Sequence, residues 1–327
     1  MPGGYHEVGF RIFHIFKKSV ENSSPVCLSN VPATPVSRLA PTPSGFLHLG
    51  NAVNFLVTWA IVRSRNGRLH LRIDDMDGIR FRPDVLDDIF TSLDWLGLDW
   101  DTGPAGPDDF YQNYSLHKKK AYYRERLQAV SKTGQHTFVC RCSRASIKKL
   151  SPNGLYPGTC RNAGLVFEPG LHTVRLRVKK NTWIQVNNQP VDLANTFGDF
   201  ILWRKDDQPG YHLASLLEDE ERGINFIVRG QDLLLSTAAQ IYLAQCFGFS
   251  SFPACRFIHH GLVRGDNGEK LSKSRGAHAL KDLRQSGGSF AGAVKTAARI
   301  LGLKHNWILT AQDLKQAIRD KELKNDE

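Results

Sequence analysis

Apolar residues recur at two spacings in the first third of the chain, and these spacings predict alternating strands and helices. A short apolar stretch that begins at Val36 leads into the Pro/Ser/Gly-rich turn of residues 41–45. An amphipathic run follows over residues 51–65, with one face made of Ala52, Phe55, Leu56, Trp59 and Ala60. This order is strand, loop, helix. In α/β folds the loop of such a unit is where phosphate groups bind.

The alternation continues beyond this first helix. Leu69, Leu71 and Ile73 occupy every second position, which predicts a strand that runs into the acidic residues 74–77. Pro83 then opens a helix whose apolar stripe faces a core: Val85, Leu86, Ile89, Phe90, Leu93 and Leu96. We therefore predict an α/β fold with a doubly wound parallel sheet, in which carboxylates at the end of a strand face the ligand crevice.

The pattern changes at both ends of the chain. Residues 1–35 precede the first strand, and we expect a disordered or surface-docked extension; a transit peptide is the weaker alternative, because acids are present and arginine is not enriched. A helix is predicted from residue 115 to about residue 134. Helical periodicity after residue 275 predicts one or two helices beyond the core.

Two short motifs carry candidate chemistry. His48, just before the first helix, can donate an N–H to a phosphate, and Gly50 leaves a bare surface on which an adenine can lie. Alone, one loop histidine is more often structural. Far downstream, Lys270-Leu271-Ser272-Lys273-Ser274 places two lysines after a Gly/Asp/Asn-rich turn, which suits a polyphosphate. In this order, the two motifs resemble the paired signatures of class I aminoacyl-tRNA synthetases.

Residues 38–45, 71–77 and 94–101 resemble the glutamate-specific synthetases closely. The resemblance covers roughly residues 36–292 and implies a Rossmann-type catalytic domain. It also implies a strand at 199–206 and a helix at 210–215. It implies ATP binding by Pro43, Gly45, His48, Gly50, Asn51, Lys270, Ser272 and Lys273, with His48, Lys270 and Lys273 as the catalytic residues. It also implies that glutamate is bound by Arg38, Ala40, Thr42, Asp74, Tyr211 and Arg229, because two carboxylates need two cationic forks and an ammonium needs an acid. Which arginine binds which carboxylate stays open.

Several positions depart from the family pattern. Asp74 stands where full-length relatives carry Glu, and Thr42 where they carry Ser. Ser215 replaces a common Asn, and Glu218-Asp219 replaces an Asp pair. Because Asp is one methylene shorter than Glu, the ammonium contact is expected to need a shifted substrate or a bridging water.

Three cysteines form the pattern Cys-x-Cys…Tyr-x-x-x-Cys between residues 140 and 160. Two thiols one residue apart, with a third brought back by a loop, are typical of structural zinc sites. The pattern resembles the zinc module of the glutamyl-Q tRNA-Asp synthetases, the truncated relatives of glutamyl-tRNA synthetase. It implies one structural Zn²⁺ held by Cys140, Cys142, Tyr156 and Cys160. Because a phenol is an unusual zinc ligand, water or His172 stays open as the fourth ligand.

Positive charge gathers around these thiols. The 327 residues carry a formal net charge of +11, which favours a polyanionic partner. Between Cys140 and Lys180 there are nine Lys or Arg against the single acid Glu168. We expect Arg141, Arg144 and Arg161 to offset the thiolate charge and to meet phosphate groups. Six cysteines clustered in this way fit reduced thiols in cytosol, and no apolar run approaches the roughly 20 residues of a membrane span.

The resemblance implies a reaction in two steps. The glutamate α-carboxylate attacks the α-phosphate of ATP, and His48, the helix start near Asn51, Lys273 and a phosphate-held Mg²⁺ stabilise the leaving pyrophosphate. Glutamate then passes to a hydroxyl of RNA, implied to lie on the queuosine base at the wobble position of tRNA-Asp. Too few residues follow the lysine motif for an anticodon-binding domain. We expect this organisation: extension (1–35), first catalytic half (36–135), zinc-binding insertion (136–195), second catalytic half (196–275) and short helical tail (276–327).

Alternative functions stay open. A truncated glutamyl-tRNA synthetase would charge tRNA-Glu. A small nucleotidyltransferase would need neither the thiols nor the glutamate pocket. A non-catalytic RNA-binding paralogue would have lost His48 or Lys273, and both are present. The expected partners are therefore ATP, L-glutamate and queuosine-containing tRNA-Asp, and the chain is expected to be a cytoplasmic monomer without a membrane partner.

Overall fold

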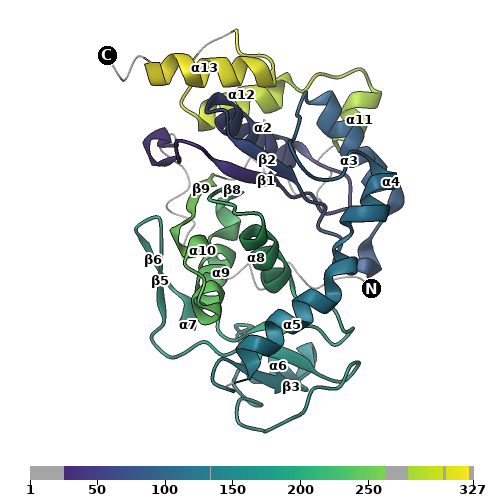
Figure 1. The fold of residues 1–327 in the computed structure, drawn as a ribbon, viewed down its shortest axis with the longest axis vertical. Coiled ribbons are helices and arrows are strands. Elements are labelled where there is room, and N and C mark those ends of the chain that lie inside the picture. Colours follow the sequence, from purple (N-terminus) through teal and green to yellow (C-terminus); the bar gives the residue numbers. More distant parts are fainter. Residues whose placement is uncertain (1–25, 133, 262–278, 305–306, 324–327) are drawn as a thin grey trace. The chain divides into compact units, whose positions relative to one another are not determined.

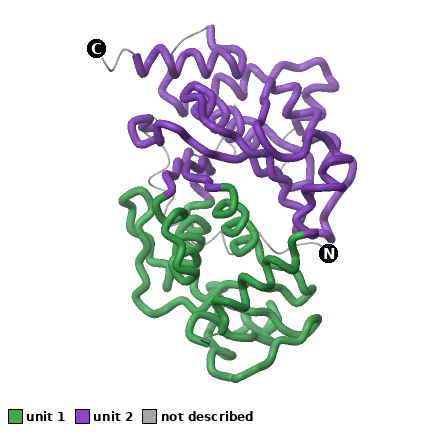
Figure 2. Tube along the Cα trace, in the orientation of Figure 1, with its two compact units in different colours: residues 1–23, 119–222, 233–254 green, residues 24–118, 223–232, 255–327 purple. Residues whose placement is uncertain are grey.

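Four small sheets, two of them parallel, organise the part of the chain that the structure describes (Figure 1). In this computed structural model, the described residues are 26–132, 134–261, 279–304 and 307–323. They divide into two units (Figure 2). Of the described residues, unit 1 holds those of 119–222 and 233–254, and unit 2 holds those of 24–118, 223–232 and 255–327. The fold is mixed α/β.

Unit 2 contains the parallel strands. β1 (Val36–Leu39) pairs with β2 (Arg68–Leu71), and α2 (Leu49–Ser64) connects them. β8 (Phe226–Gly230) pairs with β9 (Arg256–His260). Asn225 links the two pairs, because its N–H donates to the Val36 carbonyl at 3.0 Å and its Oδ1 accepts the Val36 N–H at 2.8 Å. The predicted first strand and first helix are confirmed, with the helix starting at Leu49, two residues early.

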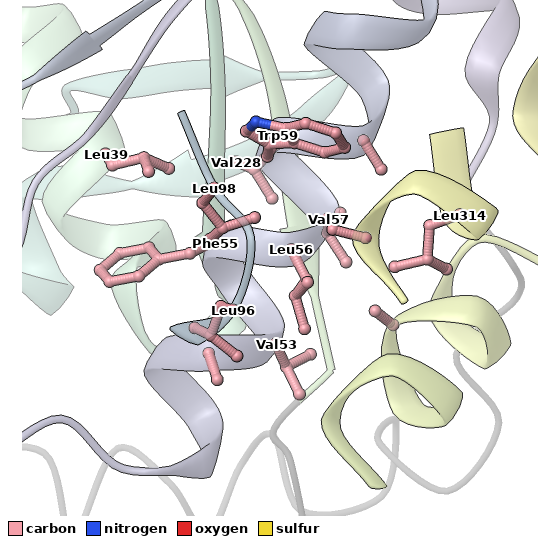
Figure 3. Packing of buried hydrophobic residues seen from close by; sticks show 14 of the residues in the cluster. Leu39, Val53, Phe55, Leu56, Val57, Trp59, Leu96, Leu98, Val228 and Leu314 are labelled. Carbon is pink, nitrogen blue, oxygen red and sulfur yellow. The ribbon is translucent and has the colours of Figure 1, made fainter. Parts of the chain in front are cut away.

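The core of unit 2 surrounds α2 (Figure 3). α3 (Pro83–Trp95) begins at the predicted proline and buries its apolar stripe. Trp59 is almost fully buried, and its indole N–H donates to Asp99 Oδ1 at 2.6 Å. Shorter elements complete this part: η1 (Leu28–Asn30), η2 (Gly78–Arg80), α4 (Pro107–Asp109) and the π-turn η3 (Phe110–Tyr114).

The C-terminal segment differs from its prediction. It forms three helices, α11 (Leu280–Gln285), α12 (Ala291–Ile300) and α13 (Ala311–Leu323), and they do not lie beyond the core. α12 and α13 pack against α2, and Leu314 joins the same cluster as Leu56 (Figure 3). The reason is that α2 is apolar around most of its circumference, so one sheet face cannot cover it. Residues 26–35 of the predicted extension also pack here, with Leu28 and Val31 buried.

Unit 1 is built on antiparallel strands. β3 (Thr137–Cys140), β4 (Thr173–Leu176) and β7 (Phe200–Trp203) form one sheet in that order. β5 (Trp183–Val186) and β6 (Gln189–Asp192) form a hairpin, whose turn residues Asn187 and Asn188 have φ of 47° and 65°. Around them lie α6 (Arg144–Leu150), α7 (Leu193–Thr196), α8 (Tyr211–Glu221), α9 (Leu234–Phe247) and α10 (Ser251–Ala254). The 3-10 turn η5 (Gln231–Leu233) follows β8 in the chain, and its first two residues belong to unit 2.

Two predicted elements of unit 1 take a different form. The helix predicted from residue 115 begins as a 3-10 turn, η4 (Leu116–Lys119), and continues as α5 (Lys120–Ser131). The strand predicted at 199–206 is β7, and it pairs antiparallel with β4. The exact domain boundaries given above stay predictions. Among the helices of the described residues, none has both the length and the apolar character that crossing a membrane requires.

Candidate functional site

His48 caps the first helix of unit 2. Its backbone N–H donates to Asn51 Oδ1 at 3.0 Å, and its Nδ1 accepts the Asn51 N–H at 3.3 Å, which forms a reciprocal capping box. In a neutral imidazole whose Nδ1 accepts a hydrogen bond, the proton sits on Nε2. The cap therefore orients His48 so that Nε2 can act as a donor, and it leaves the N-terminal N–H groups of α2 beside the 41–45 turn.

Gly50 is required by this arrangement. A Cβ at residue 50 would lie 2.9 Å from His48 Cε1 and 3.1 Å from Nδ1, so any larger residue would push the ring away. The sequence suggested a bare surface for an adenine; the contact with His48 is a second reason for glycine. The spacing His-x-Gly-Asn thus allows His48 and Asn51 to cap the helix while the His48 ring lies against Gly50.

The predicted lysine motif, Lys270, Ser272 and Lys273, lies outside the described residues. The described residues on either side of it contact the N-terminal part of α2. Before it, His260 Nε2 lies 3.1 Å from Asn54 Oδ1. After it, the Leu280 N–H donates to the Leu47 carbonyl at 2.8 Å, and Ala279 forms a bridge with His48. Described residues on both sides of segment 262–278 therefore contact α2 or the residues that lead into it.

Four residues predicted to bind glutamate are placed by β1 and β2. Hydrogen bonds from the Arg72 N–H to the Leu39 carbonyl and from the Asp74 N–H to the Pro41 carbonyl, both 2.9 Å, continue the parallel register past the named strands. In that register alternate residues share one face. Arg38, Ala40 and Thr42 therefore share a face with Asp74. Arg38 is 7% exposed.

Arg229 lies on β8, where it is 3% exposed and pairs with His259 of β9. Burial is the main cause that lowers the pKa of His259 to about 3, and the positive charge of Arg229 adds to it. His259 is therefore neutral at neutral pH. Tyr211, the sixth predicted glutamate ligand, is the first residue of α8 in unit 1 and is 43% exposed.

The three aspartates of residues 74–77 have different partners. Asp75 is buried and structural, because its carboxylate accepts the Ser115 hydroxyl at 2.5 Å and the Leu116 N–H at 3.0 Å. Asp77 forms an ion pair with Arg80. Asp74 pairs with Arg72, a buried arginine that sequence reasoning missed. The available signal was the two-residue spacing, which puts both side chains on one face of an extended segment.

Three cysteines of unit 1 form a group that can hold a metal. The sulfur atoms of Cys140, Cys142 and Cys160 all lie within 4.8 Å of one another, and those of Cys142 and Cys160 are 3.6 Å apart. A tetrahedral zinc site with Zn–S bonds of about 2.3 Å has sulfur–sulfur edges of about 3.8 Å. Tyr156 Oη lies 3.4 Å from Cys140 Sγ and 3.8 Å from Cys142 Sγ. The donor set therefore fits a zinc ion. His172 is not part of this group, and its Nδ1 accepts the Glu168 N–H.

The surroundings of Cys140 favour the ionised form that binds metal, whereas burial raises the pKa of Cys142. Burial opposes ionisation of Cys140, but the hydrogen bonds with Tyr156, with the Cys142 backbone and with Arg175 outweigh it and lower the pKa of Cys140 to about 7. The Arg175 guanidinium carbon lies 4.2 Å from the centroid of the Tyr156 ring. All six cysteines are free thiols.

Arg161 has an acidic partner that the sequence did not reveal, and its side chain is 31% exposed. It forms two hydrogen bonds of 2.6 Å with Asp199, whose side chain is fully buried, and a third of 3.0 Å with the Val178 carbonyl. Its neighbours fix it because Asp199 must be neutralised inside the unit. A cavity of about 740 Å³ in unit 1 is lined by Cys160, Arg161, Arg177 and apolar residues, and includes no acidic side chain in its lining.

The chain matches a known protein family over most of its length. Residues 35–323 match the family described as tRNA synthetases class I (E and Q), catalytic domain. The chain belongs to this family. The resemblance to glutamyl-type class I synthetases is thereby confirmed.

Relatives in bacteria match over most of their length. A protein of Symbiobacterium thermophilum named glutamyl-Q tRNA(Asp) synthetase is 35% identical over 81% of this chain and 86% of its own. Proteins of the same name from Verminephrobacter eiseniae and Prochlorococcus marinus are 36% and 37% identical, over 89% and 76% of their lengths. Two solved glutamate-tRNA synthetases, from Elizabethkingia anophelis and Elizabethkingia meningosepticum, share the fold with TM-scores of 0.62 and 0.66 at 22% and 19% identity. The chain spans 54% and 64% of those two proteins, covering 78% and 86% of its own length.

Proposed function

We propose that the chain activates L-glutamate with ATP and transfers the glutamyl group to the queuosine base in the anticodon of tRNA-Asp. The observation that carries this proposal is the match, over 76% to 89% of their own lengths, to relatives named glutamyl-Q tRNA(Asp) synthetase. Membership of the class I (E and Q) synthetase family supports the chemistry of the first step.

In the first step an oxygen of the glutamate α-carboxylate attacks the α-phosphorus of ATP, and pyrophosphate leaves with the bridging oxygen. Negative charge grows on the leaving group. We assign Nε2 of His48, the first turn of α2 with Asn51, Lys270 and Lys273 to its stabilisation. A Mg²⁺ ion bound with ATP would add positive charge there. Pro43, Gly45, Gly50 and Ser272 complete the proposed ATP site. No protein nucleophile is needed.

Glutamate recognition is assigned to the shared face of β1, β2 and β8. Arg38 and Arg229 are buried guanidinium groups for two carboxylates, and Asp74 is the acceptor for the ammonium. Ala40 and Thr42 share the face of Arg38 and Asp74. Tyr211 is assigned to the same pocket from the family pattern alone. We also propose that the two parallel pairs are parts of one doubly wound sheet, supported by the Asn225 link.

In the second step a hydroxyl oxygen of the queuosine base attacks the glutamyl carbonyl carbon, and AMP leaves. The acyl-adenylate is already activated, so this step depends on holding the RNA in place. Unstacked loop bases are common targets of sequence-specific RNA recognition. The exposed cations of unit 1 are assigned to the flanking phosphates: Arg141, Arg144, Lys148, Lys149, Lys179 and Lys180.

The metal is proposed to be one structural zinc ion, with Tyr156 as the fourth ligand. The Cys160 N–H donates to Tyr156 Oη at 2.8 Å, and a hydrogen bond of this kind would stabilise the deprotonated oxygen that binds a metal. Zinc would fix the loop that joins β3 to residue 160. A reduced thiol site of this kind also supports a cytoplasmic location.

The direct test is ATP–pyrophosphate exchange with glutamate, glutamine and aspartate in the absence of RNA, followed by transfer of labelled glutamate. Glutamate alone should support exchange, and Lys273→Ala should lower turnover by about 10²–10³ with little change in the Michaelis constant for glutamate. Label should reach queuosine-containing tRNA-Asp. Label on tRNA-Glu, or on a tRNA-Asp transcript without queuosine, would overturn the proposal in favour of a truncated glutamyl-tRNA synthetase.

A further inference from the structure

Arg72 and Asp74 lie two residues apart, directly after the last residue of β2. Their backbone N–H groups donate to the carbonyl groups of Leu39 and Pro41 in the adjacent extended segment, so the backbone of both residues is held in place. Both side chains point to the face that carries Arg38 and Thr42. The backbone thus fixes the position of Asp74, and the Arg72 side chain fixes the direction of its carboxylate.

The Arg72 guanidinium holds that carboxylate unequally. Its Nε donates to Oδ1 at 2.6 Å, whereas its Nη2 donates to Oδ2 at 3.3 Å. The Arg72 side chain is 4% exposed and the Asp74 side chain is 15% exposed. An ionised carboxylate can accept about four hydrogen bonds, so the long bond leaves Oδ2 as the oxygen with more capacity for another donor.

A buried ion pair loses much of its favourable free energy because both charges are removed from water. Apolar residues of similar volume are often equal or better for stability, so a buried arginine that holds a partly exposed acid suggests a use for that acid. The shorter side chain of Asp74, compared with the Glu of full-length relatives, makes its direction more important, because one fewer torsion is available to reach a ligand.

We propose that Arg72 is a positioning residue that holds Asp74 so that Oδ2 receives the α-ammonium group of the amino-acid substrate. The carboxylate then bridges two cations, one of the protein and one of the substrate. Without the fork, Asp74 is free to rotate toward another cation on the same face, such as Arg38, and the ammonium loses its acceptor. This inference rests on the proposed glutamate site, and it adds a residue to which no role was assigned.

The test compares Arg72→Lys with Arg68→Lys, a matched control on the exposed first position of the same strand. Lysine keeps the charge but loses the planar fork. In ATP–pyrophosphate exchange, Arg72→Lys should raise the Michaelis constant for glutamate roughly tenfold or more, the effect of one hydrogen bond to a charged group. The Michaelis constant for ATP and the unfolding midpoint should change little, and Arg68→Lys should behave as wild type.

A double variant separates positioning from packing. If Arg72 acts through Asp74, then Arg72→Lys combined with Asp74→Asn should raise the Michaelis constant for glutamate no further than Asp74→Asn alone. Fully additive losses, or an Arg72→Lys protein that weakens ATP and glutamate equally, would overturn the inference. Wild-type protein without glutamate-dependent exchange would instead overturn the proposed function, so the two failures are distinguishable.

Discussion

Two arginine–aspartate pairs, one in each unit, have the same chemistry and different surroundings. In unit 1, Arg161 binds both oxygens of Asp199, and the Val178 N–H donates to the same carboxylate at 2.8 Å. In unit 2, Arg72 binds Asp74 with one short and one long bond. The Asp199 side chain has no exposed surface, whereas 15% of the Asp74 side chain is exposed.

The difference shows how to separate a structural ion pair from a site. Asp199 is enclosed, its strong donors are internal, and its guanidinium partner follows Cys160 of the thiol group. Asp74 is held firmly on one side and is open on the other. A carboxylate that is both oriented and accessible can bind a ligand, and one that is fully enclosed can only stabilise the fold.

The largest expected effect comes from the metal beside the structural pair. Cys142→Ser should lose about one equivalent of copurified zinc and loosen residues 137–162, because binding energy at such sites is largely folding energy. Elemental analysis and hydrogen exchange would measure both. Cys246→Ser is the control, since Cys246 lies outside the metal group, and it should keep the zinc. Zinc retained in full by Tyr156→Phe would reduce Tyr156 to a packing role.

Truncating the enclosed pair is the next test. Asp199→Ala removes a fully buried carboxylate and leaves Arg161 and the Val178 N–H without their acceptor, which typically costs about 1–3 kcal/mol of folding free energy. Denaturant unfolding would measure it. Asp206→Ala removes the exposed partner of Arg204 and should cost no more than about 1 kcal/mol. Equal losses for the two variants would show that enclosure is not what distinguishes these pairs.

The third test concerns the loss of stability at low pH. It involves His259, which pairs with Arg229 across β8 and β9. Because the pKa of His259 in the folded chain is about 3, below its ordinary value of 6.5, the unfolded chain takes up this proton first as the pH falls. The contribution of neutral His259 is complete above pH 6.5 and is lost as the pH falls toward 3, by at most about 1.4 kcal/mol per pH unit. His259→Gln should flatten the dependence of unfolding free energy on pH in this window. Identical slopes in the two proteins would contradict the assignment.

Much of unit 2 could be predicted because its signals are local. The period of the apolar residues located β1, α2 and α3, and Pro83 marked a helix start that the structure has at the same residue. The motifs around His48 pointed to the family because their residue types and order are specific. The cysteine spacing was sufficient to predict a metal group, since three thiols within 21 residues of chain can meet only by a short loop.

The misses have a common cause in contacts between distant segments. Periodicity identified the C-terminal helices but could not say that α2 needs them as cover. Charge counting treated Arg161 as a cation available to RNA and could not reveal that a buried aspartate 38 residues later holds its guanidinium group. The sequence by itself determined the first two strands, the first helices, the family and the candidate ligands. Only the tertiary structure decided which charges are enclosed and which are presented, because that depends on the partners that folding brings to each carboxylate.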